Sequence, residues 1–122
     1  MKHKVTQEQY NILMKAAKAL DEQGVRSYDD RDDGCCYRGP EGNKCFVGHM
    51  IPDEKYVEDM EGKVAYDLFE EFGAVIKGFE FRDSAVLVPL QEHHDDAWLW
   101  ERERQTNPNA MQDYVKKIVE VV

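Results

Sequence analysis

Residues 34–62 read GCCYRGPEGNKCFVGHMIPDEKYVEDMEG, and this stretch differs in kind from the rest of the chain. It holds all three cysteines and a dense set of glycines, whereas the flanking sequence consists of helical apolar stripes and charged surface. Two short runs with β-forming residues, 35–38 and 44–48, flank residues 39–43, GPEGN, which favour turns. The stretch therefore predicts a β-hairpin, which ends at Pro52 because proline cannot donate to a neighbouring strand.

Four segments around this hairpin carry helix signals. Thr6 and Gln9 fit a capping box, Pro89 suits the first turn of a helix, and Asn107 followed by proline is a typical helix start. Apolar residues recur three and four positions apart between these signals. The predicted helices cover residues 6–23, 63–72 and 89–104 and a last segment that begins at Asn107.

The resulting fold class is α+β, mainly α, with three to four helices packed around a small β-hairpin. The 122 residues are the length of a single domain, 1–122. Residues 75–88 alternate only weakly, and a second hairpin near Arg82 is an open alternative. The acidic run Asp29–Gly34 lacks the ligand spacing of a calcium loop and predicts a solvated turn.

The composition is strongly acidic, with 16 Lys and Arg against 25 Asp and Glu, a net charge of −9. This balance argues against direct nucleic-acid binding, which needs clustered cations. It fits a basic protein partner, mimicry of nucleic acid, or simple solubility. No membrane span or signal peptide is recognisable, so we expect a cytoplasmic protein whose cysteines are thiols or metal ligands.

Cysteine and histidine residues suggest a possible zinc site. Two hairpin cysteines, a histidine four residues after the second, and a histidine from the third helix could form a tetrahedral set. The candidate ligands are Cys35, Cys45, His49 and His94. The favoured alternative is that the cysteines are small buried thiols, and redox chemistry is a further alternative. Apart from this possible zinc, no cofactor is expected.

The run LQEHHDD, residues 90–96, could also serve acid–base chemistry. Adjacent helical residues diverge by about 100°, so His94 is expected inside and His93 on the surface. A two-metal phosphohydrolase site would need more histidines, and nothing in the sequence brings Cys45 close to His94 as a nucleophile and base. A non-enzymatic role is therefore favoured.

Two further features suggest a surface that binds protein. Trp98 and Trp100 must face different sides of one helix, and Trp100 is taken as the exposed one, in a charged rim typical of binding hot spots. Segment 53–71 carries eight acids against two bases, which also suits a nucleic-acid mimic. The candidate partner-binding residues are Trp100, Glu58, Asp59, Glu61, Glu70 and Glu71.

The central motif resembles that of small uncharacterised proteins encoded by tailed phages, prophages and plasmids. Their pattern is C-x-Y-R-G-x-x-G-x-K-C-x-x-G-x-x-I-P-D, followed by M-E-G and later by a leucine-glutamine-x-x-His-Asp helix. The matching residues here are Cys35, Tyr37, Arg38, Gly39, Gly42, Lys44, Cys45, Gly48, Ile51, Pro52, Asp53, Met60, Glu61, Gly62, Leu90, Gln91, His94 and Asp95. The resemblance covers most of the chain, and Pro89 departs from the pattern.

The resemblance implies origin more than activity. Family members often carry cysteine where this chain has His49, which suits a metal ligand. The expected function is that of a phage or mobile-element accessory protein, a non-enzymatic binder or inhibitor of a host or defence protein in the host cytoplasm. The alternatives are a zinc-stabilised module, structural or hydrolytic, and a nucleic-acid mimic. A structural role is favoured for the motif residues Tyr37, Arg38, Gly39, Gly48, Pro52 and Asp53.

Overall fold

In a computed structural model, residues 2–29, 34–96 and 98–122 are described, and they contain six α-helices and two small sheets. The helices are α1 (Gln7–Gln23), α2 (Phe46–Met50), α3 (Ala65–Phe72), α4 (Ser84–Asp95), α5 (Trp100–Arg104) and α6 (Ala110–Ile118). The strands are β1 (His3–Val5), β2 (Tyr28–Asp29), β3 (Gly34–Cys35) and β4 (Val119–Val121). The α+β, mainly α class is therefore confirmed. The predicted acidic turn after Asp29 lies largely outside the described residues.

The first predicted helix is confirmed as α1. The Thr6 hydroxyl accepts a hydrogen bond from Gln9 N at 3.1 Å, and the Gln9 side chain accepts one from Thr6 N at 3.0 Å. These two bonds form the expected capping box and satisfy amides that the first helical turn leaves open. Gly24 ends the helix with a φ of 80°, which glycine adopts without steric cost.

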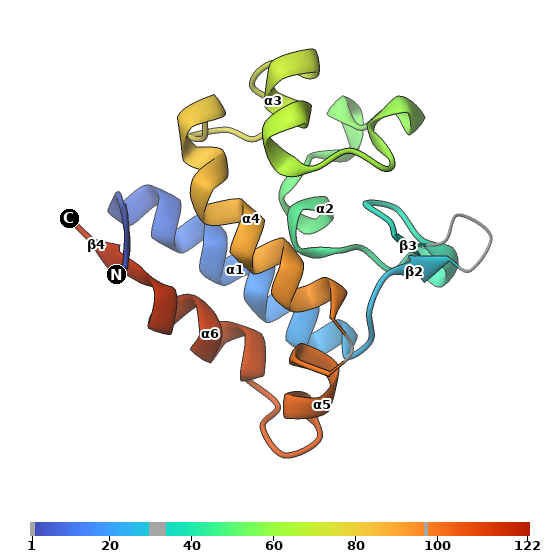
Figure 1. The fold of residues 1–122 in the computed structure, drawn as a ribbon, viewed down its shortest axis with the longest axis vertical. Helices are drawn as coiled ribbons and strands as arrows, with labels where there is room; N and C mark the ends of the chain where they lie inside the picture. Colours follow the sequence, from blue (N-terminus) through green and yellow to red (C-terminus); the bar gives the residue numbers. More distant parts are fainter. Residues whose placement is uncertain (1, 30–33, 97) are drawn as a thin grey trace.

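Helix α1 is the element around which the others pack (Figure 1). Helix α6 runs along one side of it, α2 contacts it on another, and α4 joins α2, α3 and α5. Strands β1 and β4 pair in parallel, with His3 opposite Val119, so the two ends of the chain lie side by side. We refer to α1, α4, α5 and α6 as the helical frame.

The predicted hairpin is wrong. Its second run forms α2, which Cys45 caps by accepting a hydrogen bond from Gly48 N at 3.4 Å. Its first run overlaps β3, which pairs antiparallel with β2, so that Cys35 lies opposite Tyr28. The other sheet, β1 with β4, is parallel. Short apolar runs fit a buried helical turn as well as a strand, which explains the error.

The predicted second helix, 63–72, corresponds to α3, whereas the third was placed wrongly. Helix α4 begins at Ser84, so residues 84–88 are helical rather than part of a hairpin, and it ends at Asp95. Pro89 therefore lies inside α4 instead of starting it. After the chain leaves the helix at Asp96, α5 begins separately at Trp100. The last helix begins at Ala110, slightly later than expected, after a turn in which Asn109 N donates to the Asn107 side chain.

A buried carboxylate joins α1 to α5 and α6. Asp21, 2% exposed, accepts hydrogen bonds from the Trp100 indole nitrogen, from Met111 N, and from both Gln112 N and the Gln112 side chain, each at 3.0 Å. Met111 and Gln112 occupy the first turn of α6, whose own N-cap residue provides no side-chain bond. Asp21 therefore caps α6 from another helix, and its negative charge interacts favourably with the positive N-terminal end of the α6 dipole.

The core lies where α1 meets the other helices and the turns that connect them. Trp100, Phe46 and Phe79 are among its largest fully buried side chains, one from each of three separate parts of the chain. Burial of such aromatic area is the main favourable contribution to folding in a domain of this size. Across the described ranges, every helix is too short or too polar to cross a membrane.

Candidate functional site

Arg38 anchors the segment that the sequence singled out. Its guanidinium donates to the carbonyl oxygens of Gly48 at 2.6 Å and Ile51 at 2.8 Å, and to the Asp53 carboxylate at 3.0 Å. Residues 36–64, the central segment, contain little regular structure, so their backbone groups need such partners. One planar side chain thereby fixes the end of α2 and the turn that follows it.

Glu61, near the other end of the central segment, also holds the backbone of this segment in place. Its carboxylate accepts hydrogen bonds from Tyr37 N at 2.9 Å, Arg38 N at 3.0 Å and the Tyr56 hydroxyl at 2.6 Å. Burial and the hydrogen bond to this carboxylate raise the pKa of Tyr56 above its usual range. Glu61 was predicted to bind a partner, but its oxygens are occupied within the protein.

Two motif glycines allow a close approach of backbone. A Cβ on Gly48 would lie 2.3 Å from the Tyr37 carbonyl oxygen, and one on Gly39 would lie 2.3 Å from the Ser27 hydroxyl. The Tyr37 hydroxyl in turn donates to the Lys63 carbonyl oxygen, and burial raises the pKa of this phenol far above neutrality. Pro52 precedes the short turn that begins at Asp53. These contacts support the structural role expected for the motif residues.

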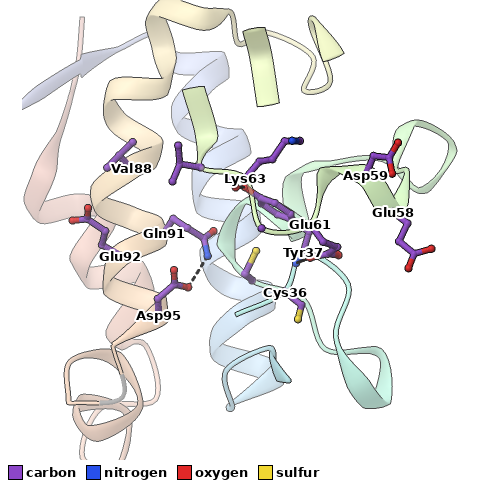
Figure 2. Close-up of a pocket in the computed structure, with 13 residues that line it drawn as sticks. Cys36, Tyr37, Glu58, Asp59, Glu61, Lys63, Val88, Gln91, Glu92 and Asp95 are labelled. Carbon is purple, nitrogen blue, oxygen red and sulfur yellow. Dashed lines mark hydrogen bonds between the residues drawn. The ribbon is translucent and has the colours of Figure 1, made fainter. Parts of the chain in front are cut away.

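A cleft of about 890 Å³ opens between α4 and the central segment (Figure 2). Figure 2 shows Val88, Glu92 and Asp95 along the α4 wall, with Glu58 and Asp59 on the opposite side. We call this cavity the acidic cleft. The carboxylates that line it are those of Glu58, Asp59, Glu61, Glu92 and Asp95.

The lining of the acidic cleft carries much more negative than positive charge. Lys63 is the basic residue in its lining, and its ammonium lies 3.0 Å from the Glu71 carboxylate on α3. Glu58, Asp59 and Glu92 are exposed at the rim. Adjacent carboxylates with low-dielectric walls concentrate negative potential, so the acidic cleft favours cationic groups.

Cys45 lies in the lining of the cleft but is 1% exposed. Burial raises the pKa of its thiol far above neutral pH, and the Asp95 and Glu61 carboxylates add to this effect. A thiol that stays protonated is a poor nucleophile. The expected alternative of a buried core thiol therefore fits Cys45.

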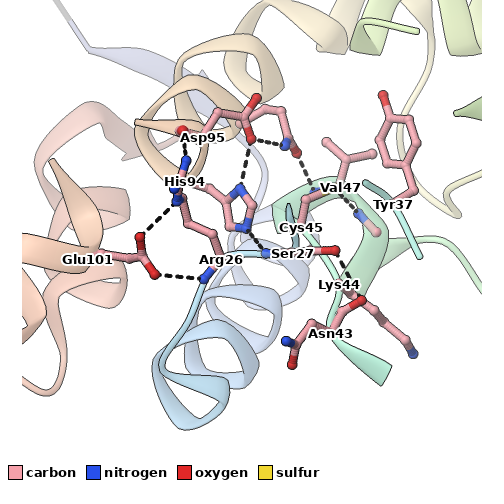
Figure 3. Close-up of polar contacts among 12 residues, drawn as sticks. Arg26, Ser27, Tyr37, Asn43, Lys44, Cys45, Val47, His94, Asp95 and Glu101 are labelled. Atoms are coloured by element: carbon pink, nitrogen blue, oxygen red, sulfur yellow. Dashed lines mark hydrogen bonds and ion pairs between the residues drawn. The ribbon is translucent and has the colours of Figure 1, made fainter. Parts of the chain in front are cut away.

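His94 belongs to a chain of polar contacts that runs from Ser27, just before β2, to α2 (Figure 3). Ser27 N donates to His94 Nε2 at 3.2 Å, so this nitrogen is unprotonated, and His94 Nδ1 donates to Asp95 at 2.8 Å. Gln91 donates to the same carboxylate oxygen at 2.7 Å and accepts from Val47 N at 3.0 Å. The Nε2 lone pair of His94 is consequently used by the backbone.

The structure does not bring the predicted zinc ligands together. His49 Nε2 lies 2.9 Å from the Gln23 side-chain oxygen, His94 is occupied on both nitrogens, and the buried Cys45 sulfur accepts from Gly48 N at 3.4 Å. The side chain of Cys35 lies outside what the structure describes. Within the described residues, no three histidine, cysteine, aspartate or glutamate side chains are grouped to hold a metal ion. Cys45, His49 and His94, the members of the predicted set whose side chains are described, therefore do not form a zinc centre.

His93 is buried rather than on the surface, which corrects the expectation for the HHDD run. Its ring stacks on Tyr114 with centroids 3.7 Å apart, and its Nε2 lies 2.8 Å from the Glu103 carboxylate. Burial lowers its pKa, although Glu103 opposes the shift. His93 and His94 thus contact different elements, and among the described residues neither belongs to a group of three His, Cys, Asp or Glu side chains that could hold a metal ion, as a phosphohydrolase centre would require.

The exposed tryptophan is Trp98 and not Trp100. Trp100 is fully buried, whereas Trp98 is 74% exposed, with Arg102 over its ring at 5.5 Å. The prediction failed because it assumed one continuous helix, whereas α4 and α5 are separate. The remaining predicted partner-binding acids divide into two groups. Glu58 and Asp59 line the acidic cleft, while Glu70 and Glu71 are exposed on α3 outside it.

Sequence reasoning missed the residues that organise the site through backbone bonds. Gln23 accepts from Lys44 N at 2.9 Å and donates to Lys44 O at 3.0 Å, joining α1 to the central segment as a strand partner would. Gln91 joins α4 to α2 in a similar way. Gln91 lies in the leucine-glutamine motif, which was the one available signal, whereas Gln23 belongs to no recognised pattern.

Comparisons of the chain with protein families, with curated proteins and with solved structures found no match. The geometry of the acidic cleft is therefore the basis for the functional argument. That geometry combines a cavity, an excess of negative charge and two apolar side chains in the lining, Val64 and Val88.

Proposed function

We propose that this protein is a non-enzymatic binding protein that receives a basic segment of a partner protein in the acidic cleft. The observation that carries the proposal is the cleft itself, a cavity of about 890 Å³ with five carboxylates in its lining. The one lysine of the lining is paired with Glu71 on α3. A concave site of one charge attracts oppositely charged segments and selects against acidic ones.

The chemistry of the candidate catalytic groups supports binding over catalysis. Cys45 is buried with a raised thiol pKa, and His94 Nε2 accepts from Ser27 N. A nucleophile and a base must lie within hydrogen-bond reach and in reactive protonation states. The groups around the cleft instead satisfy one another, which suits a rigid recognition surface.

The resemblance of the central motif to phage, prophage and plasmid proteins suggests the kind of partner. We propose a host or defence-system protein in the host cytoplasm, bound or inhibited through a basic segment. The row of acids in segment 53–71, which prompted the nucleic-acid mimicry hypothesis, is interrupted by the inward-facing Glu61 and by Asp53, which lies 3.0 Å from Arg38. A local cleft therefore accounts for the charge better than an extended row of phosphate-like groups.

A pair of charge-matched variants tests the proposal. The cleft variant carries Glu58→Gln, Asp59→Asn and Glu92→Gln, and the control variant carries Glu22→Gln, Glu54→Gln and Glu70→Gln, which remove the same charge from exposed positions outside the cleft. Each tagged protein is used to capture partners from host lysate at 50 and 500 mM salt.

We expect wild type and control to retain one stoichiometric protein at low salt and to release it at high salt, because screening weakens exposed ion pairs. The cleft variant should lose this protein at both salt concentrations. Equal capture by the cleft and control variants would show that total charge, and not the acidic cleft, is responsible, and would refute the proposal.

A further inference from the structure

The α4 wall of the acidic cleft carries an apolar side chain followed by acidic ones. Val64, the N-cap of α3, and Val88, on α4, both line it, and Val64 is 50% exposed. Val88 precedes Glu92 by one helical turn and Asp95 by two, so the α4 wall changes from apolar to acidic along its length. Figure 2 shows this order on α4, with Val88 at one end and Asp95 at the other.

The spacing on α4 sets the spacing in a ligand. Four helical residues rise by ~6 Å, which separates Val88 from Glu92 along the wall. In an extended peptide, side chains two residues apart point to the same side and are separated by ~6.6 Å. An extended segment can thus place an apolar side chain at Val88 and a basic one, two residues later, at Glu92.

We propose that the acidic cleft recognises an apolar-x-basic sequence in an extended segment of its partner. The apolar side chain packs between Val64 and Val88, and the cation lies against Glu92 on α4, where the acids Glu58 and Asp59 of the opposite wall add to the negative potential. This inference rests on the proposed function and adds a sequence preference to it. Charge alone would accept any basic segment, whereas the apolar wall selects a particular order of residues.

Peptide titrations followed by ¹H–¹⁵N NMR test this preference. Three acetylated and amidated peptides with glycine flanks contain Ile-Ser-Arg-Arg, Ser-Ser-Arg-Arg and Ile-Ser-Gln-Gln. We expect the first to bind about fivefold more tightly than the second, because part of the isoleucine surface leaves water. The third should not bind measurably. The shifted resonances should include those of Val64, Val88 and Glu92.

Variants of exposed valines provide the matched control. Val64→Ser should reduce the affinity for the Ile-Ser-Arg-Arg peptide to that of the Ser-Ser-Arg-Arg peptide and leave the latter unchanged. Val25→Ser, at a valine 47% exposed and outside the cleft, should alter neither. Such a coupling between one protein side chain and one peptide side chain identifies a direct contact.

The outcomes separate this inference from the proposed function. Binding of both arginine peptides with less than a twofold difference, or an equal loss for both in Val64→Ser, would overturn the apolar-x-basic preference and leave the basic-segment proposal in place. Failure of both arginine peptides to shift any resonance of the acidic cleft would overturn the two proposals together.

Discussion

The helical frame and the central segment are held in place in different ways. In the frame, apolar stripes pack against one another, and the backbone bonds lie within each helix. In the central segment, backbone groups depend on a few side chains, among them Arg38, Glu61 and Gln23. The frame should therefore unfold as one unit, whereas the central segment should loosen locally when a single polar anchor is lost.

The strongest test of the frame is Trp100→Ala. Trp100 is fully buried, and its indole nitrogen donates to Asp21, so its removal leaves a large cavity and one open acceptor position. We expect a loss of about 4 kcal/mol in the free energy of unfolding, measured by urea denaturation. Trp98→Ala should cost less than about 0.5 kcal/mol, since that ring is exposed. Similar losses for both variants would contradict the assignment of Trp100 to the core.

Asp21→Asn should be the next most damaging change. The amide keeps the shape of the carboxylate, but its nitrogen replaces one oxygen. It then faces either Met111 N and the Trp100 indole or the two nitrogens of Gln112, and all of these groups also donate. One or two buried donors would then lack an acceptor, at a cost of about 3 kcal/mol in urea denaturation. Glu22→Gln, at the neighbouring exposed position, is the matched control and should be close to neutral. Hydrogen exchange should accelerate across the whole frame, because Asp21 connects three of its helices.

The first helix of the frame was predictable because its signals are local. The capping box at Thr6, the apolar periodicity of α1, and Gly24 all act within a few residues of the element that they define. The errors in the frame have long-range causes. Pro89 was taken as a start signal, but α4 extends five residues before it. The cap of α6 comes from Asp21, 90 residues before Met111, and no local pattern reveals it.

Arg38→Lys should lower the free energy of unfolding by less, and its effect should be concentrated in the central segment. An ammonium cannot reproduce the planar fork that reaches Gly48 O, Ile51 O and Asp53 at once. We expect a loss of about 2 kcal/mol in urea denaturation, with faster amide exchange concentrated in residues 46–53. Arg82→Lys, at a side chain that is 83% exposed, controls for the change of residue type. Uniformly faster exchange over the frame would show that the two regions are not separable.

The site was only partly predictable, for the same physical reason. The sequence drew attention to the motif and to Glu58 and Asp59, which line the acidic cleft, and a role for acidic charge stays a prediction. It could not reveal that α4 faces these acids, because that pairing depends on bonds such as Gln91 to Val47 N between distant elements. The cysteine and histidine pattern suggested a metal, yet each described member of the set has a partner within the fold that only the three-dimensional arrangement shows.

The pH dependence of stability gives the smallest and most specific effect. Burial, together with the nearby cations Lys44 and Arg38, lowers the pKa of His49 to about 4. In the unfolded chain a histidine binds a proton below pH ~6.5. Between these two values the unfolded state takes up a proton that the folded state does not, so stability must fall as the pH falls from 6.5 towards 4. Above pH 6.5 both states are neutral, and this contribution is absent.

We expect His49 to account for a loss of about 1 to 2 kcal/mol between pH 7 and pH 4.5, after allowance for its partial exposure. His49→Gln removes the titrating group and should flatten the fall by that amount in urea denaturation at the two pH values. His93, whose pKa burial also lowers, should leave a residual dependence that His93→Gln reduces in turn. His49 lies in α2 and His93 in α4, so their contributions should affect different parts of the chain. Acid should accelerate amide exchange around α2. His49→Gln should suppress this acceleration, and His93→Gln should not. If neither substitution changed the slope, burial of these two histidines would not be the cause of the acid sensitivity.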